Sequence, residues 1–276
     1  MFVWLASYPK SGNTWLRLLL DSMHSGGAAV NLESTALNAP QASDRNLFDE
    51  ALGLKSSDLT PVEVEVLRPR AFFLEAANAQ KPLFRKVHDA WRYTKEGEEL
   101  FPSTLTHTAI YMVRDPRDVA ISLAHHMSVN IDDAIEMMSD TTFTLAPVAQ
   151  GLSILLPQVL LSWDKHVESW LDRSGLSPLL LRYEDMLEDP VACCRAICSR
   201  LGWTLKEGVI DAAIEQTSFR RLADQEKRTG FSERGAPDRP FFRAGRAGGW
   251  LNILTTDQIR RIEKSQGLMM KRLGYH

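Results

Sequence analysis

A strand, a polar loop and an amphipathic helix follow one another at the start of the sequence. Residues 2–7 (FVWLAS) are almost continuously apolar, as is typical of a parallel strand covered on both faces. The loop YPKSGN comes next, and apolar side chains then recur at helical spacing: Trp15, Leu18, Leu19 and Met23. A helix is therefore predicted from Asn13 or Thr14, and the three elements together indicate a parallel-sheet fold.

Three further stretches are typical of strands, and helical patterns lie between them. They are residues 83–88 (LFRKVH), 108–114 (TAIYMVR) and 178–185 (PLLLRYED). Strands that alternate with helices predict an α/β fold with a mostly parallel sheet and helices on both faces. A chain of 276 residues suits one such domain, and we expect it to cover residues 1–276.

Capping residues and prolines mark the start of one long helix. Thr60 is the predicted N-cap, Pro61 lies in the first turn and Glu63 completes a capping box. Pro69 lacks a backbone N–H, so we expect it to divide the segment into two helices.

Other helices are predicted further along the chain. Asp115 and Asp189 each precede a proline and are typical caps. Residues 161–174 are predicted to be helical, with a core of apolar side chains: Leu161, Val167, Trp170 and Leu171. The apolar residues 151–161 are expected to form a buried helix or a wall of the substrate site, and a final helix is predicted from Thr255 or Thr256 to about Leu273.

Composition excludes several classes of function. The net charge of −3 gives no overall basic surface for nucleic acid, so any anion site must be local. The cysteines (Cys193, Cys194 and Cys198) do not have the spacing of a disulfide scaffold. A helix would place Cys194 and Cys198 on one face, where they are predicted to be small core side chains in a reducing, cytoplasmic compartment. Residues 151–161 are too short for a membrane span and Pro157 interrupts them.

In a parallel sheet, ligands bind beyond the carboxyl ends of the strands. Four segments of this chain follow strand ends, and we expect them to converge: Ser7–Trp15, Lys86–Trp91, Arg114–Ser122 and Arg182–Asp185.

The loop after the first strand has the features of an anion site. Backbone N–H groups from Ser11 to Thr14 at a helix N-terminus can form a nest, Gly12 permits close approach, and Lys10 adds a positive charge. The alternative is a capped helix with an exposed lysine. The Walker pattern G-x-x-x-x-G-K-[ST] is not met, because no lysine follows Gly12. The phosphate-binding features remain without the Mg²⁺-binding ones, which favours a donor that needs no metal.

Two other segments carry candidate chemistry. Arg114 and Ser122 can reach one phosphate, one as a bidentate donor and one through its hydroxyl; alternatively, Arg114 pairs with Asp115 or Asp118 and Ser122 only packs. Lys86 and His88 lie two apart on a strand and so share a face, where they could act as an acid/base pair.

The histidine assignment depends on that position at a strand end, because any one of the other histidines is an ordinary surface or core residue: His24, His107, His125, His126, His166 and His276. No spacing typical of a metal site occurs, so no metal ligand is assigned.

The motifs together resemble those of sulfotransferases that use 3′-phosphoadenosine 5′-phosphosulfate (PAPS). YPKSGNTW resembles the 5′-phosphosulfate loop, VRDPRDVAIS the 3′-phosphate motif and KVH the Lys-x-His strand of that family. YEDM, QTSF (Gln216–Phe219) and FFRAGRAGGWLNILT also match, in the family's order, from Tyr8 to Thr255. The resemblance implies a P-loop NTPase-like topology.

The resemblance also implies roles for individual residues. The 5′-phosphate would be bound by the loop and the start of its helix: Ser11, Gly12, Asn13 and Thr14. The adenine would contact Trp15, Tyr183, Thr217 and Phe219. The 3′-phosphate would be bound by Arg114, Ser122, Arg243 and Gly245. Lys10 would hold the oxygen that bridges phosphate and sulfate, His88 would be the general base and Lys86 would contact the transferring group.

The implied reaction is in-line transfer of the sulfuryl group to a hydroxyl or amine of a small-molecule or natural-product acceptor. The co-substrate is PAPS, the product is adenosine 3′,5′-bisphosphate (PAP), and no metal is required. A P-loop kinase using ATP–Mg²⁺ is the alternative, and a non-catalytic nucleotide-binding protein is a third hypothesis. The identity of the acceptor and the oligomeric state stay open, although the family often forms homodimers.

The chain departs from the family pattern near its C-terminus. Ala244 stands where many members have lysine, and GGW (Gly248–Trp250) stands where GDW is common. One phosphate contact is therefore expected to be lost, and Lys81, Arg246 or another loop residue could replace it. Residues 224–249 are expected to form a lid loop over donor and acceptor. Acceptor walls are expected at residues 25–49 and 125–158.

Overall fold

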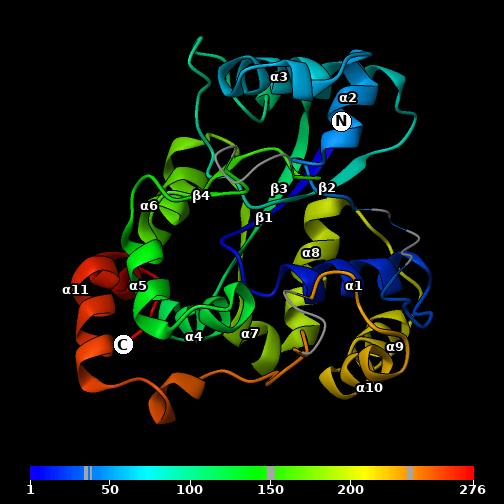
Figure 1. Cartoon of the computed structure of the whole chain (residues 1–276). Coiled ribbons are helices and arrows are strands. Elements are labelled where there is room, and N and C mark those ends of the chain that lie inside the picture. The colour runs from blue at the N-terminus through cyan, green and yellow to red at the C-terminus, as the bar shows by residue number, and fades with distance from the viewer. Residues whose placement is uncertain (34–36, 38, 148–152, 235–238) are drawn as a thin grey trace. The chain divides into compact units, whose positions relative to one another are not determined.

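The computed structural model describes residues 1–33, 37, 39–147, 153–234 and 239–276. Figure 1 shows the elements in chain order: β1 (Phe2–Ser7), α1 (Asn13–His24), α2 (Arg45–Leu52), η1 (Ser56–Asp58), α3 (Pro61–Asn78), β2 (Leu83–Val87), η2 (Ser103–Leu105), β3 (Thr106–Val113), α4 (Pro116–Met127), α5 (Ile131–Ser139), β4 (Thr144–Leu145), β5 (Gln158–Val159), α6 (Trp163–Glu168), η4 (Ser169–Arg173), β6 (Leu179–Arg182), α7 (Tyr183–Glu188), α8 (Pro190–Leu201), α9 (Val209–Gln216), α10 (Phe219–Thr229), η5 (Gly249–Asn252) and α11 (Thr256–Arg272).

The described residues fall into two compact units. The first unit consists of residues 1–8, 39–111 and 140–180, and the second of residues 9–38, 112–139 and 181–276. Each unit takes its residues from three separate stretches of the chain. The expectation of one domain over residues 1–276 stays a prediction.

The sheet has the strand order β2-β1-β3-β6. Strands β1 and β2 pair in parallel, with Phe2 opposite Leu83 and Ala6 opposite Val87. Every residue of β1 is buried, as its continuous apolar sequence predicts. The α/β fold with a parallel sheet is thus confirmed, and β1, β2 and β3 begin and end within two residues of their predicted bounds. Strands β4 and β5, which form a separate two-stranded sheet, were not predicted.

Aromatic side chains form much of the core of the first unit. The rings of Phe2 and Trp4 stack with centroids 4.5 Å apart, and Phe72 of α3 meets Trp4 edge-on at 5.1 Å. Trp4 Nε1 donates to the hydroxyl oxygen of Thr106 at 2.8 Å, which satisfies its polar atom inside the core. Helices α2 and α3 pack against each other in this unit (Figure 1).

The prediction that Pro69 divides α3 is wrong, whereas the predicted start of the helix is confirmed. Thr60 and Glu63 form a reciprocal capping box, and the helix then runs unbroken from Pro61 to Asn78. Pro69 and Phe72 are both buried. Packing of this helical face therefore outweighs the local cost of a helical proline, about 3 kcal/mol.

Helices dominate the second unit. Helix α1 packs against α9, and α11 packs against both α4 and α5. The predicted caps are present: Asp115 accepts the N–H of Arg117, Asp189 accepts the N–H of Ala192, and Thr255 forms a capping box with Gln258. Cys194 is buried on α8, and Cys198 on the same helix is only partly buried.

Three other segments differ from their predicted structure. Strand β6 stops at Arg182 and Tyr183 begins α7, so residues 183–185 are helical. Residues 153–161 contain β5 and no helix, residues 151–152 lie outside the described part, and α6 begins at Trp163 after Leu161 adopts a left-handed φ of 62°. Helix α10 continues to Thr229, which removes residues 224–229 from the expected lid loop. Residues 235–238 of that loop lie outside the described part.

Candidate functional site

The loop after β1 turns sharply to start α1. Lys10 has a φ of 68° and Gly12 a φ of 103°, and the positive value is unusual for a lysine. Helix α1 then begins at Asn13 with Gly12 as its N-cap and without a side-chain hydrogen bond to the cap. The backbone N–H groups of its first turn are therefore not capped by a side chain of the N-cap residue, and a helix N-terminus attracts an anion.

Two observations at this loop fit a bound phosphate. Ser11 is fully buried, and its hydroxyl oxygen has no hydrogen-bond partner among the described residues. Buried hydroxyls are almost always paired, so an unpaired one calls for a ligand or a water. A Cβ at Gly12 would lie 2.6 Å from Cε of Met112 and 2.8 Å from Cδ2 of Tyr183, so only glycine fits here.

Thr14, another predicted phosphate contact, already touches a carboxylate. Its hydroxyl donates to Oε2 of Glu233 at 2.9 Å, and Arg17 forms an ion pair with the same glutamate. Glu233 belongs to the segment that follows α10. The first turn of α1 thus accepts a negatively charged group in this structure, as its dipole favours.

Arg114 lies at the end of β3 with its guanidinium over the ring of Tyr183, 4.3 Å from the centroid. One terminal nitrogen donates to the carbonyl oxygen of Arg246 at 3.0 Å and lies 3.6 Å from the carboxylate of Asp118. The alternative pairing with Asp118 is therefore present as a long contact, whereas Asp115 pairs with Arg117. The Nε atom of Arg114 is buried without a partner among the described residues, which leaves a donor for an anion.

The aromatic candidates gather around these groups. Trp15 meets Tyr183 edge-on at 5.7 Å, and a Cβ at Gly245 would collide with the ring of Phe219. Thr217 is fully buried, and its hydroxyl donates to the carbonyl oxygen of Ala213 within α9. In the structure, Trp15 therefore contacts Tyr183, and Phe219 lies against Gly245. The hydroxyl of Thr217 is already used in a hydrogen bond to the main chain of α9.

A small cavity in the second unit is lined mostly by lysine, arginine and histidine side chains. Its lining residues are Lys10, Ser122, His125, His126, Arg239, Pro240, Phe241 and Arg243. Lys10, Ser122 and Arg243 were predicted from the sequence to bind the donor, and the structure brings them to one cavity. The Nζ of Lys10 lies 4.1 Å from the centroid of Phe241, a cation–π contact between the loop and the segment after α10.

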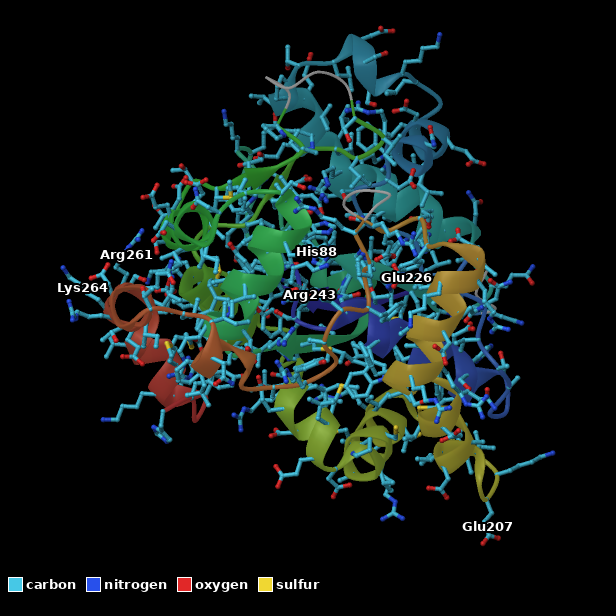
Figure 2. All side chains as sticks on the ribbon, turned by 60° about the horizontal axis from the view of Figure 1, so that its bottom comes forward. His88, Glu207, Glu226, Arg243, Arg261 and Lys264 are labelled. Carbon is cyan, nitrogen blue, oxygen red and sulfur yellow. The ribbon has the colours of Figure 1, made fainter. Side chains whose placement is uncertain are left out.

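Glu226 of α10 forms hydrogen bonds with the segment that contains Phe241 and, two residues later, Arg243 (Figure 2). The buried carboxylate of Glu226 accepts the backbone N–H groups of Phe241 at 2.7 Å and Phe242 at 2.9 Å. Although burial alone would raise it, the pKa of Glu226 is held below its ordinary value by these two N–H groups and by Arg234. The ionised carboxylate of Glu226 is therefore the form that holds Phe241 and Phe242 against α10.

Lys86 and His88 lie at the end of β2 in the first unit, and both are buried. Nδ1 of His88 is 2.9 Å from the carbonyl oxygen of Ser7, at the end of the neighbouring strand β1. A carbonyl oxygen can only accept, so Nδ1 carries the hydrogen and Nε2 carries the lone pair. This tautomer suits a general base that acts through Nε2.

Sequence reasoning missed the histidine that holds the main chain of His88 and a buried ion pair at the next residue. The Nε2 atom of His166 lies 3.0 Å from the His88 carbonyl oxygen, and the Tyr111 hydroxyl lies 2.8 Å from Nδ1 of His166. Next to His88, Asp89 forms a bidentate ion pair with Arg68, with both side chains almost fully buried. A buried His in a helix gives no signal of its own in the sequence, and Arg68 was read only as part of a helix.

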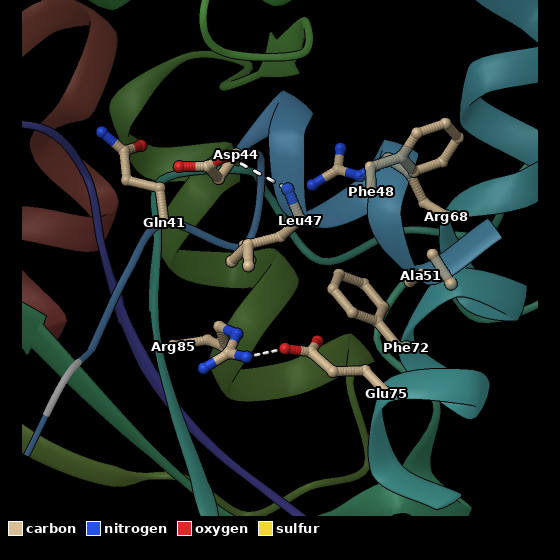
Figure 3. Close-up of a pocket in the computed structure, with 11 residues that line it drawn as sticks. Gln41, Asp44, Leu47, Phe48, Ala51, Arg68, Phe72, Glu75 and Arg85 are labelled. Carbon is tan, nitrogen blue, oxygen red and sulfur yellow. Dashed lines mark hydrogen bonds and ion pairs between the residues drawn. The ribbon is translucent and has the colours of Figure 1, made fainter. Parts of the chain in front are cut away.

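A second cavity, in the first unit, is drawn in Figure 3. Apolar side chains line much of it, and Arg85 points to Glu75, with which it forms an ion pair. Burial lowers the pKa of Arg85 to about 10, and Asp44 opposes that shift. Because the charges that face this cavity are already paired, we assign it no ligand.

Among residues 1–33, 37, 39–147, 153–234 and 239–276, no three His, Cys, Asp or Glu side chains gather where they could hold a metal ion. Within the same residues, no helix has the length and apolar character needed to cross a membrane.

The predicted contacts divide between the two units. All the residues expected to bind the nucleotide belong to the second unit, and Lys86 and His88 belong to the first. Within the units, three contacts join residues of the four segments that were expected to converge: His88 meets Ser7, Arg114 approaches the carbonyl oxygen of Lys10 at 3.5 Å, and Tyr183 lies against Gly12. The role of each residue stays a prediction.

Curated sulfotransferases resemble this chain in sequence over nearly its whole length. A flavonol 3-sulfotransferase of Flaveria bidentis is 26% identical over 287 residues, with 99% of this chain and 81% of that protein covered. Sulfotransferase 1A1 of Bos taurus is 28% identical over 272 residues, with 94% and 80% covered.

Solved structures show the same fold. The structure of mouse sulfotransferase SULT7A1 complexed with PAP has a TM-score of 0.62 at 20% identity, with 98% of this chain and 84% of that chain covered. A retinol dehydratase in complex with androsterone and inactive cofactor PAP also has a TM-score of 0.62, at 23% identity, with 98% and 80% covered. The model of the sulfotransferase domain matches residues 2–274, and the chain therefore belongs to the sulfotransferase domain family.

Proposed function

We propose that this protein transfers a sulfuryl group from PAPS to a hydroxyl or amine of a small-molecule or natural-product acceptor. The observation that carries the proposal is the loop at Lys10–Asn13. In this loop, the fully buried hydroxyl of Ser11 has no hydrogen-bond partner among the described residues. The N-cap of α1 is Gly12, where there is no room for a side chain. Membership of the sulfotransferase domain family makes PAPS the donor of choice for such a loop.

The donor supplies an activated sulfuryl group and a phosphate leaving group when it is bound. Ser11 and the backbone N–H groups of the first turn of α1 would bind the 5′-phosphate. Lys10 would offset the negative charge that develops on the bridging oxygen as the S–O bond breaks. Arg114 would offer its unpaired Nε to the 3′-phosphate, which distinguishes this donor from ATP.

The acceptor is activated by His88 in this proposal. With Nδ1 donating to the Ser7 carbonyl, the lone pair on Nε2 takes the proton from the acceptor oxygen or nitrogen as that atom attacks sulfur. Lys86 would stabilise the transferring group. A bond forms between sulfur and the acceptor oxygen or nitrogen as the S–O bond to the phosphate breaks. The electrons of the broken bond go to the leaving phosphate, and the acquired proton stays on His88 until it is released to solvent.

Donor binding can be tested by thermal unfolding with PAP, and with ATP plus Mg²⁺ as the comparison. A ligand at 100 times its Kd adds about 2.7 kcal/mol of stability. For a chain of this size that corresponds to a rise in Tm on the order of 5–10 °C. We expect the rise with PAP in the presence of a metal chelator and none with ATP plus Mg²⁺.

A rise with ATP and Mg²⁺ alone would instead support the kinase alternative. No rise with either nucleotide would contradict a nucleotide site at this loop. A Ser11→Ala variant tests the loop itself, since it removes only the hydroxyl. It should weaken the effect of PAP and leave the Tm without ligand nearly unchanged.

A further inference from the structure

The cavity beside the loop contains a cation that no sequence motif assigned. Arg239 lines it together with Ser122 and Arg243. Arg239 is partly buried, whereas Arg243 is exposed. An inference about Arg239 rests on the proposed function, because it concerns the same donor site.

Arg239 is fixed to the helix that carries Ser122. One terminal nitrogen of its guanidinium donates to the carbonyl oxygen of His125 at 3.2 Å, in the last turn of α4. The C-terminal end of a helix favours a cation. On α4, Ser122, His125 and His126 have i, i+3 and i+4 spacing, so they share one face of the helix, and all three line the cavity.

The backbone on the other side of Arg239 is also held in place. Glu226 accepts the N–H groups of Phe241 and Phe242, and both phenylalanines pack against the cluster of Leu18, Val30, Leu32, Leu222 and Phe231. Arg239 and Arg243 lie on either side of this fixed pair, and both face the cavity. Arg239 is therefore held by contacts before it meets a ligand, which lowers the entropic cost of binding one.

The charge of the cavity favours an anion. Its described lining contains one lysine, two arginines, two histidines and one serine, and no carboxylate. A guanidinium can donate two parallel hydrogen bonds to a phosphate, so a second arginine beside Arg243 suits a dianionic group. Ala244, next to Arg243 in the sequence, can supply no such contact.

We propose that Arg239 binds the 3′-phosphate of the donor together with Ser122 and Arg243, and that it supplies the cation that Ala244 lacks. The ligand class is a phosphate monoester on the ribose of the nucleotide. The distinguishing consequence is selectivity for a nucleotide with a 3′-phosphate over one without it.

Calorimetric titration of the full chain with PAP and with adenosine 5′-monophosphate tests this inference. The variants are Arg239→Ala, Arg239→Lys and the control Arg228→Ala, which removes an exposed arginine of α10. A hydrogen bond to a charged group corresponds to about 10- to 100-fold in affinity. We expect Arg239→Ala to weaken PAP binding by about that factor and to leave binding of the monophosphate unchanged.

Arg239→Lys should recover part of the lost PAP affinity, because lysine keeps the positive charge but cannot donate two parallel hydrogen bonds to one phosphate. Arg228→Ala should bind both nucleotides like the unchanged protein. Equal Tm values for the variants without ligand would show that folding is intact.

Two results in the variants would overturn the inference while leaving the proposed function standing. One is normal PAP binding by Arg239→Ala, including the case in which only the KM of an acceptor rises. The other is an equal loss of affinity for both nucleotides, which would mean that Arg239 maintains the structure of the nucleotide site and does not contact the 3′-phosphate. Failure of the unchanged protein to bind PAP would overturn the proposed function itself, and the inference with it.

Discussion

His166 holds the main chain of His88 through a hydrogen bond from Nε2 of its ring to the His88 carbonyl oxygen, at 3.0 Å. Burial lowers the pKa of His166 to about 4, so the ring is neutral near pH 7. A neutral ring has one N–H, which must lie on Nε2 because a carbonyl can only accept. Nδ1 therefore accepts the hydroxyl of Tyr111. The proposed base thus has a fixed backbone and a fixed ring, the latter through Ser7.

His166 is expected to act on catalysis by positioning His88. A His166→Leu variant leaves the His88 carbonyl without its donor, and small misplacements of a reacting group cost about 10- to 100-fold in rate. We predict that kcat falls by about this factor while the Kd for PAP changes by less than about twofold. Steady-state kinetics with calorimetry of PAP binding would measure both.

His166→Gln keeps an N–H donor and should retain more of the kcat than the leucine variant. Equal losses in the two variants, or a parallel loss of PAP affinity, would contradict a positioning role and indicate general damage to the fold.

Stability should depend on pH because of the same histidine. The pKa of His166 is about 4 in the folded chain, below its ordinary value near 6.5, so the unfolded chain binds the proton more readily between these values. Stability is therefore complete above about pH 6.5, falls as the pH drops towards 4 and loses nothing more from this group below it. From pH 7 to pH 5 the loss is about 2 kcal/mol.

Urea unfolding of the unchanged protein and of His166→Gln at pH 7 and pH 5 isolates this contribution. The unchanged protein should lose about 2 kcal/mol more than the variant over that interval. An equal loss in both proteins would mean that other groups cause the pH dependence.

Gly245 is predicted to be required for the contact with Phe219. An added methyl group at this position would collide with the ring, and the φ of 58° is unfavourable for alanine. Gly245→Ala should therefore weaken PAP binding by at least about 10-fold, since a displaced ring or segment loses its contacts with the nucleotide. Gly175→Ala is the matched control, because Gly175 has a φ of 66° with nothing within 4 Å of an added Cβ. Similar PAP affinities in the two variants would contradict the prediction.

The ion pair of Arg68 and Asp89 is predicted to be essential to the stability of the first unit. Asp89→Ala leaves a buried guanidinium unpaired, which typically costs 3–5 kcal/mol, and we expect about that loss in the free energy of unfolding. Asp224→Ala removes an exposed partner of Lys227 and should cost less than about 0.5 kcal/mol. Urea unfolding of both variants measures the difference. A loss below about 1 kcal/mol for Asp89→Ala would show that water reaches Arg68.

Much of the fold could be predicted because it follows from local patterns. The apolar run before Tyr8 predicted β1, and the capping residues Thr60, Asp115 and Asp189 predicted helix starts correctly, as did the predicted start at Thr255 or Thr256. Pro69 failed as a helix breaker because packing of its buried face decides that helix. Tyr183 was placed on a strand because the apolar run before it has no stop signal at Arg182.

Only those parts of the site whose residues are close together in the sequence could be predicted. Gly12 and Ser11 belong to one continuous loop, so their nearness needed no tertiary information. Arg239 and Ser122 are far apart in sequence, and only the cavity brings them together. His166 and His88 meet through a hydrogen bond to the main chain, which leaves no side-chain pattern in the sequence.

The most direct test of the account is transfer of labelled sulfuryl from PAPS to a panel of alcohols, phenols and amines, with a metal chelator present. The unchanged protein should form labelled product and PAP. His88→Ala should bind PAP normally and transfer about 10²- to 10⁴-fold more slowly, because only proton transfer is removed. Transfer by His88→Ala at the full rate would contradict the role of His88. Phosphoryl transfer from ATP that requires Mg²⁺, with no sulfuryl transfer from PAPS, would contradict the proposed function.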